Sequence, residues 1–298
     1  MKRFTQLRLI VWLRRHQKAL AVMIITASLL FLAVYTILHP SVVAESLRIN
    51  PIVLGLLLVL YVCVLVTQFI VMSATIRLCR KQLPAKNGLL LSIYSTLINF
   101  FGPLQSGPGV RAIYLKQKIG LRIRDYAFIT MFYYFAFAAI NGSLLFINTL
   151  PILTLLGLVA SVGLTAVGVR RFKLGGLSRF VVVIFLATVV QILLMTTIFF
   201  IELHAIHPTT DYSFLQTFVY SASANLSLFV SITPGAIGIR EAFIVFAQSL
   251  HHIPLGSIIS AGVLDRTVYV LLLILLFIAS SGLHLKDMFT QKKTTKVG

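Results

Sequence analysis

Acidic residues are scarce in this chain. It has 7 Asp and Glu against 26 Lys and Arg in 298 residues, which gives a formal net charge of +19. In a soluble protein such an excess would suggest nucleic-acid binding. However, charged residues make up only 11% of the chain and hydrophobic residues 58%, a balance that leaves too little polar surface for a soluble domain of this size. The composition therefore indicates an integral membrane protein and argues against a nucleic-acid partner.

Sequence motifs of catalysis and metal binding are also lacking. The chain contains no Walker A sequence, no Gly-x-Ser-x-Gly, no His-Glu-x-x-His and no Cys-x-x-Cys pair. Of its two cysteines, Cys63 lies in an apolar run and Cys79 among basic residues at the end of that run, so they fit no metal spacing. We therefore predict no catalytic residue, no metal and no cofactor, and expect a protein that is not an enzyme.

What the chain does contain is a series of apolar runs that reach the roughly 20 residues needed to cross a bilayer. Basic residues cluster between alternate runs, which places those clusters in the cytoplasm. The segment 202–211 has no Lys or Arg and is expected to be an outside loop. The six predicted spans cover about residues 19–38, 52–76, 126–150, 152–169, 180–201 and 257–283.

The charge pattern divides the chain into three parts. Residues 1–18 alternate basic and apolar residues, which predicts an interfacial amphipathic helix. Residues 19–285 are expected to form one transmembrane domain, because no polar stretch is long enough for a soluble domain. Residues 286–298 form a basic tail. We therefore expect an all-α multi-pass protein of a bacterial or archaeal inner membrane, with both termini in the cytoplasm.

Two short stretches of the chain resemble each other. SGPGVR at 106–111 and GAIGIR at 235–240, which directly follows Pro234, each interrupt an apolar segment with Gly and Pro and end on Gly-aliphatic-Arg. The flanking charges predict that segments 88–110 and 212–250 each enter and leave on one side of the membrane, from opposite faces. Oppositely directed, interrupted segments are typical of an inverted repeat around a midplane binding site. Eight simple crossings are the alternative.

The glycines and arginines of these two breaks are the candidate binding groups. Helix N-termini with free N–H groups suit an anion such as a lipid phosphate, and an Arg fork binds phosphate with two hydrogen bonds. The glycines also fit plain turns or close packing, and Arg111 also fits an interfacial positive-inside charge. The candidate headgroup-binding residues are Gly109, Arg111, Gly235, Gly238, Arg240 and Glu241.

Asp265 and Arg266 lie about nine residues into the last predicted span, where an isolated charge is costly. Adjacent helix residues point about 100° apart, so each is expected to have its own partner. Asp265 is expected to pair with Arg240 or Arg111; an Arg240–Glu241 pair, and a transported proton on Asp265 or Glu241, are further alternatives. Secondary candidates, for which helix packing is the alternative, are Asn99, Asn225, Tyr133 and Tyr134.

These residues carry a resemblance to a known family. The sequence PGAIGIREA at 234–242, followed by a span with Asp265-Arg266, resembles the membrane region of lysylphosphatidylglycerol synthases, whose stand-alone members are called flippase-like. The sequence GVRAIYLK at 109–116 is similar to that family's first motif, Gly-x-x-x-Arg-Ala before a basic run. The resemblance covers about residues 10–285. Where the family usually carries a Glu-Arg pair, this chain has the sequence FYYF at 132–135.

The resemblance implies a membrane region that binds or moves an amphiphilic lipid. In the two-part synthases a soluble domain makes the aminoacyl lipid and the membrane region flips it, so this chain is expected not to make such lipids itself. We expect a flippase whose partners are anionic membrane lipids, together with a lipid-modifying enzyme or glycosyltransferase. Two other functions stay open: a membrane enzyme acting on a lipid-linked substrate, and a non-transporting subunit of an envelope-lipid pathway.

Overall fold

The regular structure in the described part of the chain is helical. A computed structural model describes residues 49–101, 106–171, 177–206, 208, 210–229, 236 and 239–294. The predicted interfacial helix at 1–18 and the predicted span at 19–38 lie outside these residues. The helices are α3 (Pro51–Leu78), α4 (Ala85–Phe101), α5 (Gly107–Ile119), α6 (Ile123–Leu144), α7 (Pro151–Arg171), α8 (Ser178–Ile206), α9 (Phe214–Ser227), α10 (Ile239–Phe246), α11 (Gln248–His251) and α12 (Leu255–Thr294).

Four of these helices have the length and composition of membrane spans. They are α3, α6, α8 and the part of α12 from Leu255 to Ser281, and a shorter apolar stretch, Pro151–Val167, lies in α7. Many large apolar side chains on these helices face outward, among them Ile52, Phe135 and Phe277. Because water would disfavour so much exposed apolar surface, the fold is that of an all-helical membrane-embedded protein.

Helix starts follow local sequence signals. Pro51 occupies the first position of α3, where its missing N–H is no loss, and the Asn50 side chain accepts a hydrogen bond from the Ile52 N–H at 2.9 Å. At the start of α9 the Ser213 hydroxyl accepts from the Gln216 N–H at 3.1 Å, while the Gln216 amide oxygen accepts from the Ser213 N–H at 3.0 Å. This reciprocal capping box defines where the second interrupted segment begins.

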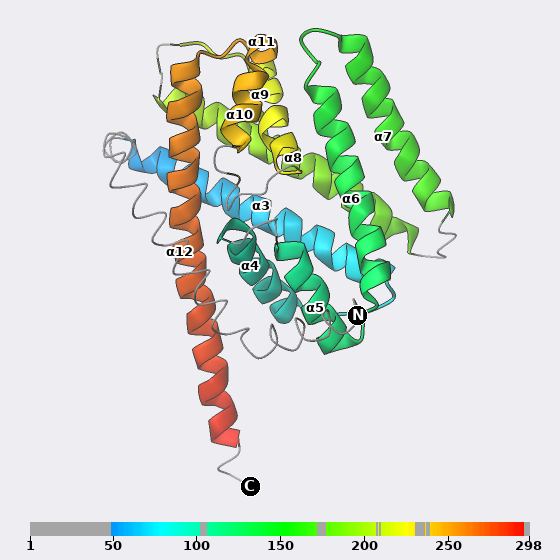
Figure 1. Cartoon of the computed structure of the whole chain (residues 1–298). Coiled ribbons are helices and arrows are strands. Elements are labelled where there is room, and N and C mark those ends of the chain that lie inside the picture. The colour runs from blue at the N-terminus through cyan, green and yellow to red at the C-terminus, as the bar shows by residue number, and fades with distance from the viewer. Residues whose placement is uncertain are drawn as a thin grey trace, which may run out of the picture.

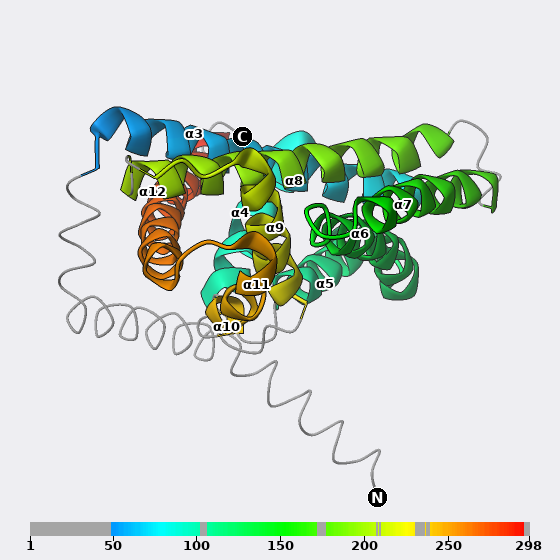
Figure 2. The same cartoon turned by 90° about the horizontal axis from the view of Figure 1, so that it is seen from above.

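The two long helices α3 and α8 pack along each other and cross the middle of the view in Figure 1. The α4–α5 pair lies below them in this view and the α9–α10 pair lies above. Helix α12 runs past both pairs and contacts them through α4 and α10, while α6 and α7 stand together at the other end. Seen from above, α3 and α8 line one side of the molecule (Figure 2). In the view of Figure 1 the interrupted segments thus lie below and above one shared scaffold.

Both interruptions predicted from the sequence are present. Segment 88–110 contains most of α4 and the start of α5, and segment 212–250 contains α9, α10 and most of α11. Within each segment the two main helices contact each other, so each forms a helix pair. The direction of each pair relative to a membrane, and the inverted repeat, stay predictions.

One predicted boundary is wrong. The sequence predicts a span at 180–201 and a loop at 202–211, but α8 continues to Ile206 and Glu202 is fully buried. Glu202 lies one turn after the buried Ile198 and Phe199, so it falls on the same inward face of the helix. At the other end of the chain, α12 extends to Thr294, so the predicted basic tail at 286–298 begins within this helix.

Candidate functional site

A cavity with two adjoining lobes lies among α3, α4, α5, α6, α8, α9, α10 and α12. The first lobe has a volume of about 140 Å³ and contains Arg111. The second has a volume of about 160 Å³ and contains Arg240. We call them the Arg111 lobe and the Arg240 lobe. The residues that line both lobes are Gln68, Asn99, Phe137, Gln191, Leu228 and Tyr269.

A close approach of α5 to α4 positions Arg111. A Cβ atom at Gly107 would lie 2.6 Å from the Ser95 carbonyl oxygen, so only glycine allows this contact. The Asn99 amide oxygen accepts a hydrogen bond from the Gly107 N–H at 3.4 Å, which satisfies a backbone donor at the break. One turn further on, the Arg111 Nε donates to the Ser95 hydroxyl at 2.5 Å. The close packing of α5 on α4 therefore determines the position of the Arg111 guanidinium.

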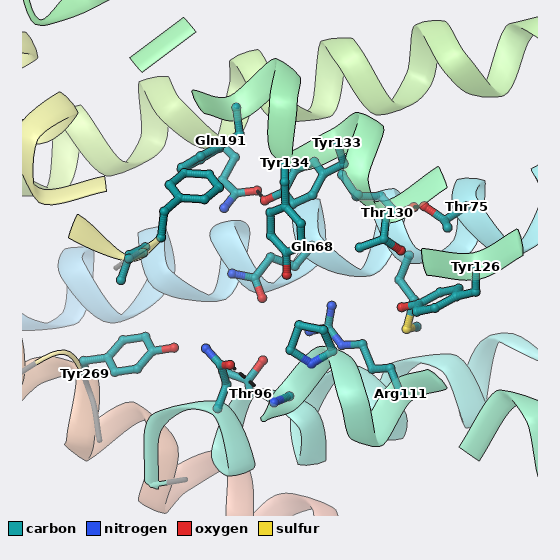
Figure 3. Close-up of a pocket in the computed structure, with 18 residues that line it drawn as sticks. Gln68, Thr75, Thr96, Arg111, Tyr126, Thr130, Tyr133, Tyr134, Gln191 and Tyr269 are labelled. Atoms are coloured by element: carbon teal, nitrogen blue, oxygen red, sulfur yellow. Dashed lines mark hydrogen bonds between the residues drawn. The ribbon is translucent and has the colours of Figure 1, made fainter. Parts of the chain in front are cut away.

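The Arg111 lobe surrounds this guanidinium with uncharged polar groups (Figure 3). The Arg111 side chain rises from α5 into the lobe, with Tyr126 on one side, Tyr269 on the other and Tyr134 opposite. The Tyr133 hydroxyl donates to the Gln191 amide oxygen at 3.1 Å. Among the described residues, no carboxylate lies within ion-pair distance of Arg111. The lobe thus offers an incoming anion one fixed positive charge and several hydrogen-bonding side chains.

The Arg240 lobe contains opposite charges that balance each other. Arg240 Nη1 donates to Asp265 in an ion pair, and the Tyr61 hydroxyl donates to the same carboxylate. Beside this pair, Arg266 forms a fork to the Glu241 carboxylate, with Nε at 3.1 Å and Nη2 at 2.7 Å from one oxygen. Neighbouring residues on α10 and on α12 therefore carry opposite charges that match across the interface, and the two pairs join these helices.

The structure decides among the pairings that the sequence left open. Asp265 pairs with Arg240 rather than with Arg111, and Glu241 contacts Arg266. Adjacent charges on α12 do have separate partners, as the helical geometry predicted. Arg240 also lies over the ring of Phe199, with 5.0 Å from Cζ to the ring centroid.

The secondary candidates have different surroundings. Tyr133 and Tyr134 line the Arg111 lobe and Asn99 lines both lobes. Asn225 lines the Arg240 lobe, but its Nδ2 donates to the Asn141 amide oxygen at 2.9 Å and thereby joins α9 to α6. Asn99 and Asn225 thus fit both interpretations, a place in the candidate site and a role in packing, because each lines the cavity and each also forms a hydrogen bond within the fold.

The glycine candidates are not all at the cavity. Gly109 is exposed and does not line either lobe, whereas Gly107, two residues earlier, lines the Arg111 lobe. Gly107 and Arg111 are four residues apart and share a helix face, while Gly109 points away from it. Gly235 and Gly238 lie outside the described residues.

Sequence reasoning missed Glu202. Its carboxyl group is fully buried in α8, and neither oxygen has a hydrogen-bond partner among the described residues. It lies within electrostatic reach of Arg240 and Asp265. The helical spacing could have indicated it, because Glu202 lies one turn after Phe199 on the same inward face of the apolar helix.

The end of the second helix pair is held by a buried histidine. His251 Nε2 donates to the Ile244 carbonyl at 3.0 Å, and its Nδ1 accepts from the Ile253 N–H at 3.0 Å. Burial lowers the pKa of His251 below its ordinary value. Both hydrogen bonds require the neutral ring with its proton on Nε2, so the environment selects one tautomer.

No protein-family model matches the chain, and no curated protein matches it. The resemblance to lysylphosphatidylglycerol synthases therefore stays a prediction, and the site is interpreted from its own residues.

Proposed function

We propose that the chain is a flippase-like lipid transporter that binds an anionic headgroup in the two-lobed cavity. The observation that carries this proposal is Arg111, a cation inside the cavity without a carboxylate at ion-pair distance in the described residues. An arginine without a counter-ion is costly in a membrane-embedded protein. A bound phosphate would offset that cost, because the guanidinium fork matches two phosphate oxygens.

The dimensions of the cavity favour a headgroup over a whole lipid. Each lobe, of about 140 and 160 Å³, is smaller than the ~300–1,000 Å³ pockets that enclose drug-sized ligands. A phospholipid or a polyprenyl-linked lipid would therefore place its charged group beside Arg111 and leave its chains outside. The phenols of Tyr126 and Tyr134 would then donate to the remaining phosphate oxygens.

In this proposal, relative movement of the two helix pairs would carry the lipid headgroup across the membrane. The α4–α5 and α9–α10 pairs would be oppositely directed hairpins of an inverted repeat with six full spans. Each carries an arginine on its second helix, and α12 contacts both. Rocking of one repeat against the other would open the cavity to each side in turn. The setting would be a bacterial or archaeal inner membrane, with both termini in the cytoplasm. The resemblance to the membrane region of lysylphosphatidylglycerol synthases fits this proposal.

A flip assay on purified protein in liposomes tests the proposal. Transfer of a fluorescent phosphatidylglycerol would be measured for wild type, Arg111→Gln and Arg111→Lys. Loss of a charge-assisted hydrogen bond of roughly 1.5–3 kcal/mol predicts a transfer rate about ten- to a hundred-fold lower for Arg111→Gln. Arg111→Lys keeps the charge and loses the fork, so its rate should fall in between.

Lys116→Gln is the matched control, because it removes the same charge from an exposed position on the same helix. Its transfer rate should equal that of wild type. Equal rates for wild type and Arg111→Gln would show that the Arg111 lobe is not the headgroup site.

A further inference from the structure

Glu202 is a buried acid that the proposed anion site does not use. It is fully buried in α8, and neither of its carboxyl oxygens has a hydrogen-bond partner among the described residues. Burial of an ionised carboxylate without compensation is among the most costly arrangements in a protein, and such a group takes up a proton instead. Ionisable residues within membrane-type helices are also functional more often than structural.

Among the described residues, the groups around Glu202 leave no uncompensated positive charge to balance it. The nearby cation is Arg240, and Asp265 already neutralises Arg240 through an ion pair. On its own helix, His204 directs Nδ1 to the Phe200 carbonyl at 2.8 Å. The titratable groups that act on Glu202 from the packed helices are Tyr61 of α3, Tyr220 of α9, Arg240 of α10 and Asp265 of α12.

Two further buried groups in this cluster also lack partners in the described residues. They are Nη2 of Arg240 and the hydroxyl of Tyr220. Both are hydrogen-bond donors, and Glu202 supplies two acceptors once it is ionised. Unpaired donors and an unpaired acid in one cluster therefore indicate a second arrangement in which they meet.

We propose that Glu202 is a proton-binding site that couples the transporter to a proton gradient. In this structure the carboxyl group holds the proton and Arg240 pairs with Asp265. On release, the O–H bond of Glu202 breaks, the proton passes to solvent and the electron pair stays on the carboxylate. Arg240 then turns its free Nη2 toward Glu202 while it keeps contact with Asp265. No oxidation or reduction is involved.

The exchange gives the second helix pair two arrangements. With Glu202 protonated, Arg240 ties α10 to α12 alone. With Glu202 ionised, Arg240 also ties α10 to α8, which draws the helix pair toward the long scaffold helices. The coupling to lipid movement rests on the proposed function, whereas the proton site itself does not.

Infrared spectroscopy of the purified protein tests the proton site directly. A buried carboxylic acid gives a C=O stretching band that is separate from the amide bands and shifts in deuterium oxide. We expect this band at neutral pH in wild type and its loss in Glu202→Gln. Glu241→Gln is the control and should keep the band, because Glu241 is paired with Arg266 as a carboxylate. A wild-type spectrum without the band, or a band unchanged in Glu202→Gln, would overturn the proposal.

A second measurement tests the coupling. In liposomes with an imposed pH gradient, the final distribution of the fluorescent lipid between leaflets would be recorded. One coupled proton shifts that distribution by up to about ten-fold per pH unit, and Glu202→Gln should remove the shift. If wild type flips lipid without responding to the gradient, the coupling is overturned while the proposed lipid transport stands. If no lipid moves but the infrared band is present, the transport proposal fails and the proton site stands.

Discussion

Arg111 and Arg240 both lie on the second helix of an interrupted pair and both line the same cavity, but their electrostatic surroundings differ. Arg111 contacts a serine hydroxyl and faces phenols, with no ion-pair partner in the described residues. Arg240 is paired with Asp265 next to a second ion pair. One copy of the repeated sequence thus presents a charge to the cavity, while the other uses its charge to join helices.

This difference separates binding from assembly. A buried arginine with a carboxylate partner has little electrostatic need for a ligand, and removal of that partner leaves a buried uncompensated charge. An arginine faced only by neutral groups retains its attraction for an anion. Replacing Arg111 should therefore change anion binding more than the stability of the fold. Breaking the Arg240–Asp265 pair should change the stability of the fold more than anion binding.

The largest expected effect on stability is that of Asp265→Asn. It leaves Arg240 buried without its counter-ion, and breaking a buried pair on one side costs roughly 3–5 kcal/mol. Thermal unfolding in detergent micelles would measure this loss. Glu241→Gln is the comparison, because the Glu241 side chain is 35% exposed, and a partly solvated pair contributes about 1 kcal/mol or less.

Glu202 bears on this prediction, since it could ionise and replace Asp265 beside Arg240. The measurement is therefore repeated in the Glu202→Gln background, where no such replacement exists. Unchanged stability of Asp265→Asn in both backgrounds would mean that the Arg240–Asp265 pair does not hold α10 to α12.

A smaller effect is expected at the joint of the first helix pair. In Gly107→Ala the new methyl group would meet the Ser95 carbonyl oxygen at 2.6 Å, so α5 must move off α4. Overpacking of this kind costs about 1–3 kcal/mol, and it displaces Arg111 from the lobe. Gly109→Ala is the matched control, because its methyl group meets nothing within 4 Å, and it should be as stable as wild type or slightly more so. Equal melting temperatures for the two variants would contradict the close approach.

The smallest expected effect is a pH dependence of stability that arises from His251 at the end of the second helix pair. Because the folded-state pKa of His251 is lowered by burial, the unfolded chain binds a proton more readily than the folded one. The stabilisation is complete above the ordinary histidine pKa of ~6.5 and is lost as the pH falls below it. Melting temperatures across this range should show the loss in wild type and in His252→Asn, which changes an exposed neighbour. His251→Asn should lack that part of the pH dependence. If its melting temperatures changed with pH as those of wild type do, His251 would not be the group responsible.

The long helices and the two interruptions could be predicted from the sequence because they follow from local properties. Apolar runs indicated α3, α6 and α12, and Gly and Pro marked both breaks. The end of α8 could not be predicted in this way, since Glu202 and His204 interrupt the apolar composition although Glu202 lies on the buried face. Composition cannot distinguish a polar loop from a buried polar group.

The details of the site depended on contacts between distant segments. The sequence indicated that Asp265 needs a partner, but two arginines were available and only the packing of α10 on α12 selects Arg240. The sequence also drew attention to Gly109, because it stands in the repeated Gly-aliphatic-Arg pattern. The rotation of α5 instead turns Gly107 and Arg111 toward α4, and that rotation is set by tertiary packing.

Lipid binding measured by native mass spectrometry tests the central claim most directly, that Arg111 and not a general basic surface holds the anionic headgroup. Phosphatidylglycerol and a zwitterionic lipid would be titrated into wild type, Arg111→Gln and Lys116→Gln. The account predicts a preference for phosphatidylglycerol in wild type and in Lys116→Gln, and an affinity about ten- to a hundred-fold weaker in Arg111→Gln. Undiminished phosphatidylglycerol binding by Arg111→Gln would contradict it.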